Sequence, residues 1–422
     1  MTDSFTTMGS LLGALARALN LIDPNVENHH QQTAYLSFMI ARGAQFTDEE
    51  LELTIYAALL HDIGFITGDE QKSVAELETE AVKLSRTGAS ILRGLSGAEP
   101  VSDIILHCQC PWTDYLALPD EIRERESQSA RIASVIHLAD VISTMIKPDE
   151  PIIHQRSFLR SAAVSMRDKE FSAEAVDAFL IVSEFEFIWM DLRYNPQFLT
   201  FFAGKLHDVS LDRTVELTGL MSRIIDYRSS FTAMHSAGVA ASAEAMARLC
   251  GMSEDECKMM KIAGYLHDVG KLTTPRAILE KPGKLTDEEF DRVKEHPYYT
   301  RLILLDVKGF DKIADWAGFH HEKLDGSGYP YHIGADELDL GARIVAVADI
   351  FSAITEVRPY RTGMKKEQAM KLLNGDAAAG KLCSGVVDVL NQNYEEIDRA
   401  REEAARTEGA RYYASIGMGK AE

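Results

Sequence analysis

Apolar and small side chains recur every three to four positions along most of the chain, whereas the alternation of apolar and polar residues that marks a half-buried strand is scarce. The clearest helical pattern covers residues 231–249. Ser253 and Glu256 then form a capping-box signature, which predicts a second helix that runs to His267 and is ended by Gly270. The pattern therefore predicts an all-α fold.

Further helix signals lie toward both ends of the chain. Thr286 with Glu289 is another capping box, and Pro297 stands where it can begin the next helix. Residues 393–408 predict a helical C-terminal segment, and residues 1–23 predict an amphipathic helix. Because residues 1–23 lack a basic start and no segment is apolar throughout a bilayer-spanning length, we expect neither a signal peptide nor a membrane span.

The chain contains an internal repeat. YAALLHDIG at 56–64 resembles KIAGYLHDVG at 261–270, and the shift that places the first on the second also places His29 on His235 without a gap. A further correspondence, between RIASVIHLADVIS and RIVAVADIFSAI, aligns Asp140 with Asp349. The repeat predicts two tandem helical domains, which we expect to meet within 195–212 and to occupy 1–200 and 201–405, followed by a tail at 406–422.

Composition limits the partners of this chain. It has 422 residues, a formal net charge of −21 and a pI near 5.1. A nucleic-acid polymer is therefore not expected as a partner, because neutralising its phosphates requires a basic face. An anionic substrate would have to meet positive charge that is created locally, for example by bound metal ions.

The five cysteines are scattered and odd in number, which favours a reducing cytoplasm over a disulfide framework. His107, Cys108 and Cys110 lie close together in the sequence and offer a zinc site as one interpretation. Since no second cysteine pair accompanies them, buried thiols are the other interpretation.

The second half of the chain holds a set of residues that metal sites commonly use. Histidine and aspartate stand at predicted helix ends or within the repeated segments, and a single ion rarely takes so many protein ligands. The set predicts two divalent ions bridged by a carboxylate, with iron or manganese preferred and zinc also compatible. Its members are His235, His267, Asp268, His296, His320, His321 and Asp349.

These residues stand in the segments HDVGK, EHPYYT, HHEKLDGSGYP, VADIF and RPYR. With them the chain resembles the HD-GYP branch of the HD phosphohydrolases, a family of bacterial phosphodiesterases of cyclic dinucleotides. The resemblance covers most of 210–375, and the tandem arrangement is similar to that of two-HD-domain phosphodiesterases of 3′3′-cGAMP. It implies two tandem HD-type helical bundles and a cytoplasmic signalling enzyme.

The resemblance also implies how the metal ligands are shared. One ion would be held by His235, His267, Asp268 and Asp349, and the other by His296, His320 and His321, with Asp268 as the bridge. Some family members bind a third ion through a glutamate one helical turn before the first histidine. Phe231 occupies that place here, so the sequence predicts two metals.

The family resemblance implies a metal-bridging hydroxide as the nucleophile, with Asp268 in a catalytic role as the bridging ligand. It also implies that Lys271 contacts a phosphate oxygen, although a solvated surface lysine remains an alternative. Two adjacent histidines, His320 and His321, can share a target only near a helix end or beside a compact multi-metal centre. We expect them where a helix gives way to a loop.

The loop that follows these histidines is expected to contact the substrate. Asp325 and Gly328 allow a tight turn, and Tyr329 with Pro330 would form a wall against a guanine base or its sugar. A turn that only packs is the alternative. Arg358 and Arg361 are expected to contact phosphate or a guanine edge, with an exposed salt bridge as the other interpretation.

The first half is interpreted as a degenerate copy with a regulatory or structural role. It keeps a residual metal site of four residues: His29, His61, Asp62 and Asp140. His107 and Cys108 fall near the positions of His320 and His321, and the region around Leu84 offers no histidine to match His296. A homodimer is expected by analogy with docked pairs of like domains.

The sequence therefore predicts a metal-dependent phosphodiesterase that hydrolyses cyclic di-GMP or 3′3′-cGAMP to a linear dinucleotide. One alternative is a broader HD phosphohydrolase of mononucleotides, which would have no need of the GYP loop. The other is a receptor that binds a cyclic dinucleotide without cleaving it, which could lose the metal ligands and Lys271 without penalty.

Overall fold

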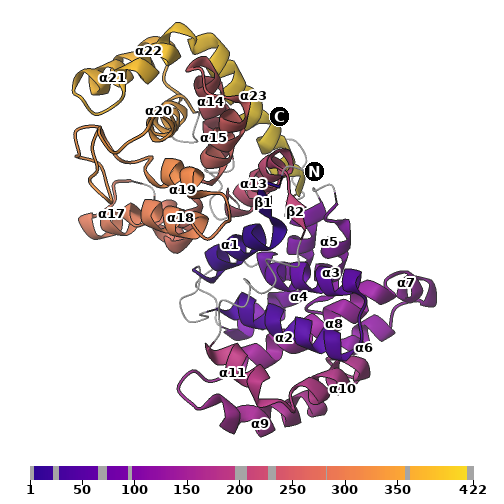
Figure 1. Ribbon diagram of the computed structural model, residues 1–422. Helices are drawn as coiled ribbons and strands as arrows, with labels where there is room; N and C mark the ends of the chain where they lie inside the picture. The colour runs from indigo at the N-terminus through magenta and orange to yellow at the C-terminus, as the bar shows by residue number, and fades with distance from the viewer. Residues whose placement is uncertain are drawn as a thin grey trace. The chain divides into compact units, whose positions relative to one another are not determined.

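The computed structural model describes residues 4–21, 28–64, 74–93, 97–194, 207–226, 234–281, 283–356 and 362–415. The described chain is almost entirely helical, as the sequence pattern predicts (Figure 1). The one sheet within it is a short antiparallel pair, in which β1 (Thr6–Thr7) lies beside β2 (Asp208–Val209). The all-α prediction is confirmed.

The chain divides into two compact units. One unit is Met8–His207, and the other combines Met1–Thr7 with Asp208–Glu422. The first few residues therefore join the C-terminal unit through the pairing of β1 with β2, and Phe5 packs its ring against Phe310 there. A two-residue strand is too short to be recognised by its alternation, so no sequence pattern pointed to this pairing.

The helices of the N-terminal unit extend from α1 to α11. Their bounds are α1 (Met8–Asn20), α2 (His29–Gly43), α3 (Asp48–Leu60), α4 (Val74–Arg93), α5 (Glu99–His107), α6 (Trp112–Leu116), α7 (Asp120–Arg125), α8 (Ser127–Thr144), α9 (Ile152–Ser165), α10 (Ala173–Val182) and α11 (Glu186–Tyr194).

The C-terminal unit contains eleven α-helices in its described residues and one 3₁₀ helix, η3 (Val269–Thr273). The α-helices are α13 (Leu211–Asp226), α14 (His235–Leu249), α15 (Glu254–Leu266), α16 (Arg276–Leu279), α17 (Asp287–Lys294), α18 (His296–Leu304), α19 (Asp311–Gly318), α20 (Leu340–Thr355), α21 (Lys366–Ala378), α22 (Ser384–Gln392) and α23 (Tyr394–Ser415). Helix α23 continues across 405–406, the expected start of the tail. (The 3₁₀ helix and α16 lie between α15 and α17.)

The packing of the two units repeats. In the C-terminal unit α14 packs on α15 and α20, and α19 packs on α15 and α18. In the N-terminal unit α2 packs on α3 and α8, and α5 packs on α3 and α4. Each unit thus buries a central helix against the same set of neighbours, in agreement with the internal repeat.

Local signals fix several helix starts. Ser253 accepts from the backbone N–H of Glu256 and the Glu256 side chain accepts from the N–H of Ser253, so α15 begins with the predicted capping box. Thr286 and Glu289 do the same for α17. Among the described residues, every helix is too short or too polar to traverse a lipid bilayer.

The predicted role of Gly270 was wrong. Helix α15 ends at Leu266, His267 is its C-cap, and Gly270 lies inside η3. A Cβ added at Gly270 would lie 2.0 Å from the carbonyl oxygen of His296 and 2.7 Å from the backbone nitrogen of Thr300. Glycine is therefore needed here because two backbones approach closely, and not because a helix must stop.

Candidate metal centre

The seven predicted ligands come from five elements of the C-terminal unit. His235 begins α14, His267 and Asp268 follow the end of α15, and His296 begins α18. His320 and His321 come directly after α19 and its C-cap residue, where a helix gives way to a loop as predicted, and Asp349 lies within α20. Helix ends free these side chains from the regular helical spacing, so residues distant in sequence meet at one place.

Asp268 lies between two groups of imidazoles. Its Oδ2 atom is 3.2 Å from His267 Nε2, and its Oδ1 atom is 3.4 Å from His296 Nε2 and 3.9 Å from His320 Nε2. Within the described residues, Asp268 Oδ1 and His267 Nε2 are buried without a hydrogen-bond partner. Buried nitrogen and oxygen atoms without partners at one place fit metal ions, which would accept their lone pairs.

Asp349 closes the other side of the centre. Its Oδ1 atom is 3.0 Å from His235 Nε2 and 3.8 Å from His267 Nε2, and its Oδ2 atom is 3.9 Å from His321 Nδ1. The ligand atoms form two sets, and within each set they all lie within 4.8 Å of one another. One set is His235, His267 and Asp268, and the other is His296, His320 and His321. Two ions bridged by Asp268 would take one set each.

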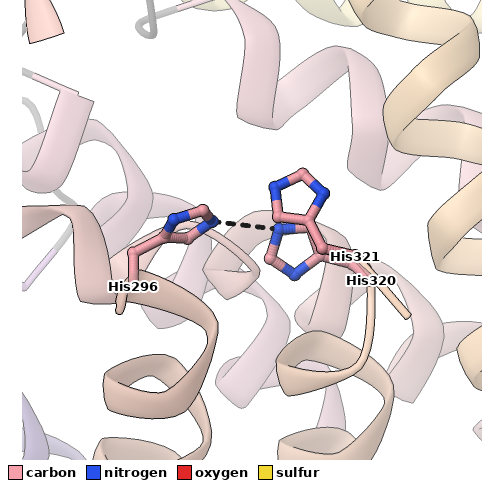
Figure 2. Close-up of side chains that lie close together, drawn as sticks. All are labelled: His296, His320 and His321. Atoms are coloured by element: carbon pink, nitrogen blue, oxygen red, sulfur yellow. Dashed lines mark hydrogen bonds between the residues drawn. The ribbon is translucent and has the colours of Figure 1, made fainter. Parts of the chain in front are cut away.

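Figure 2 shows the second set. His296 approaches from the start of α18, with its Nε2 atom 3.2 Å from His320 Nε2. The rings of His320 and His321 lie with their centroids 4.0 Å apart, so consecutive residues present two imidazoles to one centre.

The backbone fixes which nitrogen of each buried imidazole faces inward. Nδ1–H of His267 donates to the carbonyl of Gly264 at 2.8 Å, that of His296 to Val293 at 2.6 Å and that of His320 to Ala317 at 2.6 Å. Because a carbonyl oxygen can only accept, Nδ1 carries the proton, and Nε2 is left with a lone pair for a metal. Each acceptor lies three residues before its histidine.

Burial and neighbouring charges favour the ionisation states that ligands need. Burial lowers the pKa of His296 to about 3 and that of His320 to about 4, which keeps both imidazoles neutral. Burial opposes the charge of Asp268, but His267 and Lys271 outweigh it and hold the pKa of its carboxyl well below the usual range. His235 is the exception: its hydrogen bond to Asp349 and the nearby Glu356 carboxylate outweigh burial and raise its pKa to about 9, which favours the protonated ring over a free ligand.

The predicted substrate residues have different surroundings. Lys271 Nζ lies 2.5 Å from Asp268 Oδ2, directly at the centre. The Tyr329 ring packs 4.8 Å from the ring of His321, and half-buried Pro330 follows it. Gly328 packs tightly on the backbone of His321 and the next residue.

Of the remaining predicted substrate residues, the structure describes only Asp325. The exposed Asp325 carboxylate accepts from the backbone N–H and the hydroxyl of Ser327, so it stabilises its own turn. Arg358 and Arg361 lie outside the described residues.

Sequence reasoning missed two buried carboxylates beside the centre. Glu356 Oε2 lies 3.6 Å from His235 Nδ1, where it can orient that ring from behind. Glu322 is 3% exposed and accepts from the backbone N–H of Tyr331 at 2.7 Å, which ties the GYP loop to the paired histidines. Glu356 is the C-cap residue of α20, neither acid belongs to the internal repeat, and the only available signal was the acid directly after two histidines, Glu322.

The N-terminal unit brings its four predicted ligands together. His29 Nε2 is 3.0 Å from Asp140 Oδ1, and His61 Nε2 is 3.1 Å from Asp62 Oδ2. His30, which was not predicted, joins them.

The other predicted counterparts lie differently. His107 pairs with Glu126 at 3.2 Å, and Cys108 Sγ contacts the carbonyl of Ile104. Neither of them, nor Cys110, belongs to a potential ligand group in the part of the chain that the structure describes.

Comparisons with known proteins agree with both units. Residues 26–145 and residues 219–382 each match a family model described as an HD domain. The chain is 30% identical over 404 residues to a 3′3′-cGAMP-specific phosphodiesterase of Vibrio cholerae, with 90% of each chain covered. It is 40% identical over 142 residues to a cyclic di-GMP phosphodiesterase of Pseudomonas aeruginosa, with 33% of this chain and 34% of that one covered.

A solved structure shows the same fold. The crystal structure of a cyclic GMP-AMP-specific phosphodiesterase of V. cholerae superimposes with a TM-score of 0.63 at 21% identity, and the match covers 92% of this chain and 98% of that chain. The likeness extends through both helical units.

Proposed function

The chain belongs to the HD-GYP family of HD phosphohydrolases, and from that premise we propose that it is a metal-dependent phosphodiesterase that opens a cyclic dinucleotide to its linear form. The observation that carries the proposal is the convergence of six imidazole and carboxylate side chains around Asp268, with unpartnered nitrogen and oxygen atoms facing inward. The carboxylate and the six other ligands would hold two divalent ions, iron or manganese by preference.

When bound, such a pair of ions supplies an acidified water as nucleophile and positive charge for the phosphoryl transition state. The chain's own residues prepare the site for this chemistry. The carbonyl acceptors behind His267, His296 and His320 hold the rings in place before substrate arrives. Tyr329, on the ring of His321, would limit where a base can lie.

The choice among substrates is tested with purified protein loaded with Mn(II) or Fe(II). We expect 3′3′-cGAMP or cyclic di-GMP to be converted to the linear dinucleotide, and we place 3′3′-cGAMP first because a relative that aligns along both units is named for it. Release of phosphate from GMP, with the cyclic dinucleotides left intact, would support a mononucleotide phosphohydrolase instead. Tight binding without any product would support a receptor.

Lys271 is proposed to contact the scissile phosphate. Its ammonium lies at the centre and its side chain is 24% exposed, so a phosphate oxygen can reach it. We expect Lys271→Gln to lower kcat roughly 10²-fold, because one charged donor to the transition state is lost, while the metal content stays unchanged. Turnover and metal analysis on the same sample check this.

The matched control for Lys271 is Lys308→Gln, which changes an exposed lysine in the same unit. It is expected to leave turnover and metal content unchanged. If Lys271→Gln loses metal in proportion to activity, the lysine holds Asp268 in place and does not serve the substrate.

Two further proposals concern the location and the oligomeric state of the protein. We propose a cytoplasmic location, and a homodimer that light scattering of the purified chain would detect as twice the mass of 46.9 kDa. A monomeric mass at micromolar concentration would contradict the dimer.

A further inference from the structure

His30 lies in the N-terminal cluster although nothing in the internal repeat predicts it. It is the second residue of α2 and is 7% exposed. Its Nδ1 atom is 2.5 Å from Oδ1 of Asn20, at the end of α1. An amide oxygen only accepts, so Nδ1 carries the proton. Nε2 is then bare, and it is buried without a hydrogen-bond partner in the described structure.

The other two imidazoles of the cluster are oriented in the same way. Nδ1–H of His61 donates to the carbonyl of Ala58 at 2.8 Å. The hydroxyl of Ser143 donates to the carbonyl of Asp140 and so accepts from Nδ1–H of His29 at 3.2 Å. All three rings therefore present an Nε2 lone pair to the two carboxylates.

The spacing of these atoms fits one ion. His29 Nε2 is 3.0 Å from Asp140 Oδ1 and His61 Nε2 is 3.1 Å from Asp62 Oδ2. Two ligands at right angles around an ion, each at ~2.1 Å from it, lie about 3 Å apart. His61 belongs both to a ligand group with His29 and Asp140 and to one with His30 and Asp62. A single Nε2 lone pair cannot bind two ions, so the two groups describe one site.

A second ion would lack one of the ligand atoms that the C-terminal unit offers. The side-chain amide of Gln109 donates to Asp140 Oδ2 at 3.1 Å, so this carboxylate has only Oδ1 turned toward the histidines. In the C-terminal unit, Oδ2 of Asp349 instead faces His321.

His30 replaces an imidazole that the N-terminal unit has lost. A Cβ at Gly64 would lie 2.0 Å from the carbonyl of Leu84, as one at Gly270 would from the carbonyl of His296, so Leu84 occupies the place of His296. The position of His30 is in turn held by Ser236 in the C-terminal unit, directly after His235.

We propose that His30 is a metal ligand, and that with His29, His61, Asp62 and Asp140 it completes a site for one divalent transition-metal ion, separate from the C-terminal pair. Three imidazoles and two carboxylates suit manganese, iron or zinc. The N-terminal unit is on this view a differently built metal domain and not a decayed copy.

The test measures metal binding and does not depend on hydrolysis. The full chain is stripped with a chelator and titrated with Mn(II), and free Mn(II) is followed by electron paramagnetic resonance. Asp268→Ala is used as the background, because it is expected to remove the C-terminal pair and leave one bound equivalent. Adding His30→Gln should weaken that equivalent at least about tenfold, and Asn20→Ala, which leaves the imidazole in place, should weaken it less.

His154→Gln, an exposed histidine of the same unit, is the matched control and should bind as the background does. Thermal unfolding of the metal-free proteins separates a lost ligand from a lost fold, because His30→Gln should keep the metal-free midpoint and lose the rise caused by Mn(II). The proposal is overturned if the background binds no Mn(II), or if His30→Gln binds it with the same affinity as the background.

Discussion

Replacing Asp268 by alanine is expected to lower cyclic-dinucleotide hydrolysis at least about 10³-fold and to remove both ions of the C-terminal centre. The expectation follows from its position: one carboxylate oxygen faces His267 and the other faces His296 and His320. A single substitution therefore removes the ligand common to both sets, and with it the charge that stabilises the transition state. Turnover and bound metal, measured on the same preparation, check both parts.

The control for Asp268 is Asp388→Ala, which removes an exposed carboxylate of the same unit and should leave turnover and metal content as they are. Chelation should inactivate the wild type and added Mn(II) should restore it, whereas neither should change the Asp268 variant. Full activity in Asp268→Ala, with circular dichroism like that of the wild type, would contradict the proposed centre.

The sequence predicted the positions that meet at the centre better than it predicted how they are held. The repeated HD dipeptide and the capping boxes determine where helices begin and end, and chemistry-bearing residues stand at those ends. The carbonyl acceptors behind His267, His296 and His320 could not be predicted, because any residue supplies a carbonyl and the sequence carries no trace of its use.

His30 and Glu356 were missed for a related reason. An alignment of the two halves reveals only the residues that both retain, and in that alignment His30 corresponds to Ser236. Glu356 comes one residue after the end of α20 and approaches His235 only in three dimensions. A ligand gained by one copy, or an acid that acts from behind a ligand, leaves no internal pattern to detect.

The function of Gly270 was misread because glycine after a helix usually marks a C-cap. In the structure it is a contact point between η3, which carries Lys271 just after Asp268, and the start of α18, which carries His296. The hydroxyl of Thr300 accepts from the backbone N–H of Gly270 and donates to the carbonyl of His267, which joins the same two segments. The distance between the two ligand sets thus depends on the absence of a side chain at Gly270.

Gly270→Ala is therefore expected to separate the two ligand sets. A methyl group at 2.0 Å from the carbonyl oxygen of His296 meets backbone, which cannot rotate away as a side chain would. Overpacking a buried site usually costs about 1–3 kcal/mol, and a clash between two backbones should fall at or above the upper end. We expect a lower urea midpoint, a loss of the ion held by the second set, and hydrolysis reduced roughly 10²-fold or more, in proportion to the metal lost.

Gly375→Ala provides the matched control, because a Cβ at this exposed position of α21 would have no heavy atom within 4 Å. Alanine in a helix interior is about 0.5–1 kcal/mol more favourable than glycine, so this variant should keep its activity and unfold at a slightly higher urea concentration. The two variants add the same methyl group, and they should shift stability in opposite directions. If Gly270→Ala retains both ions and full turnover, the contact of η3 with α18 does not set the spacing of the centre, and the ligands must be positioned by the helices alone.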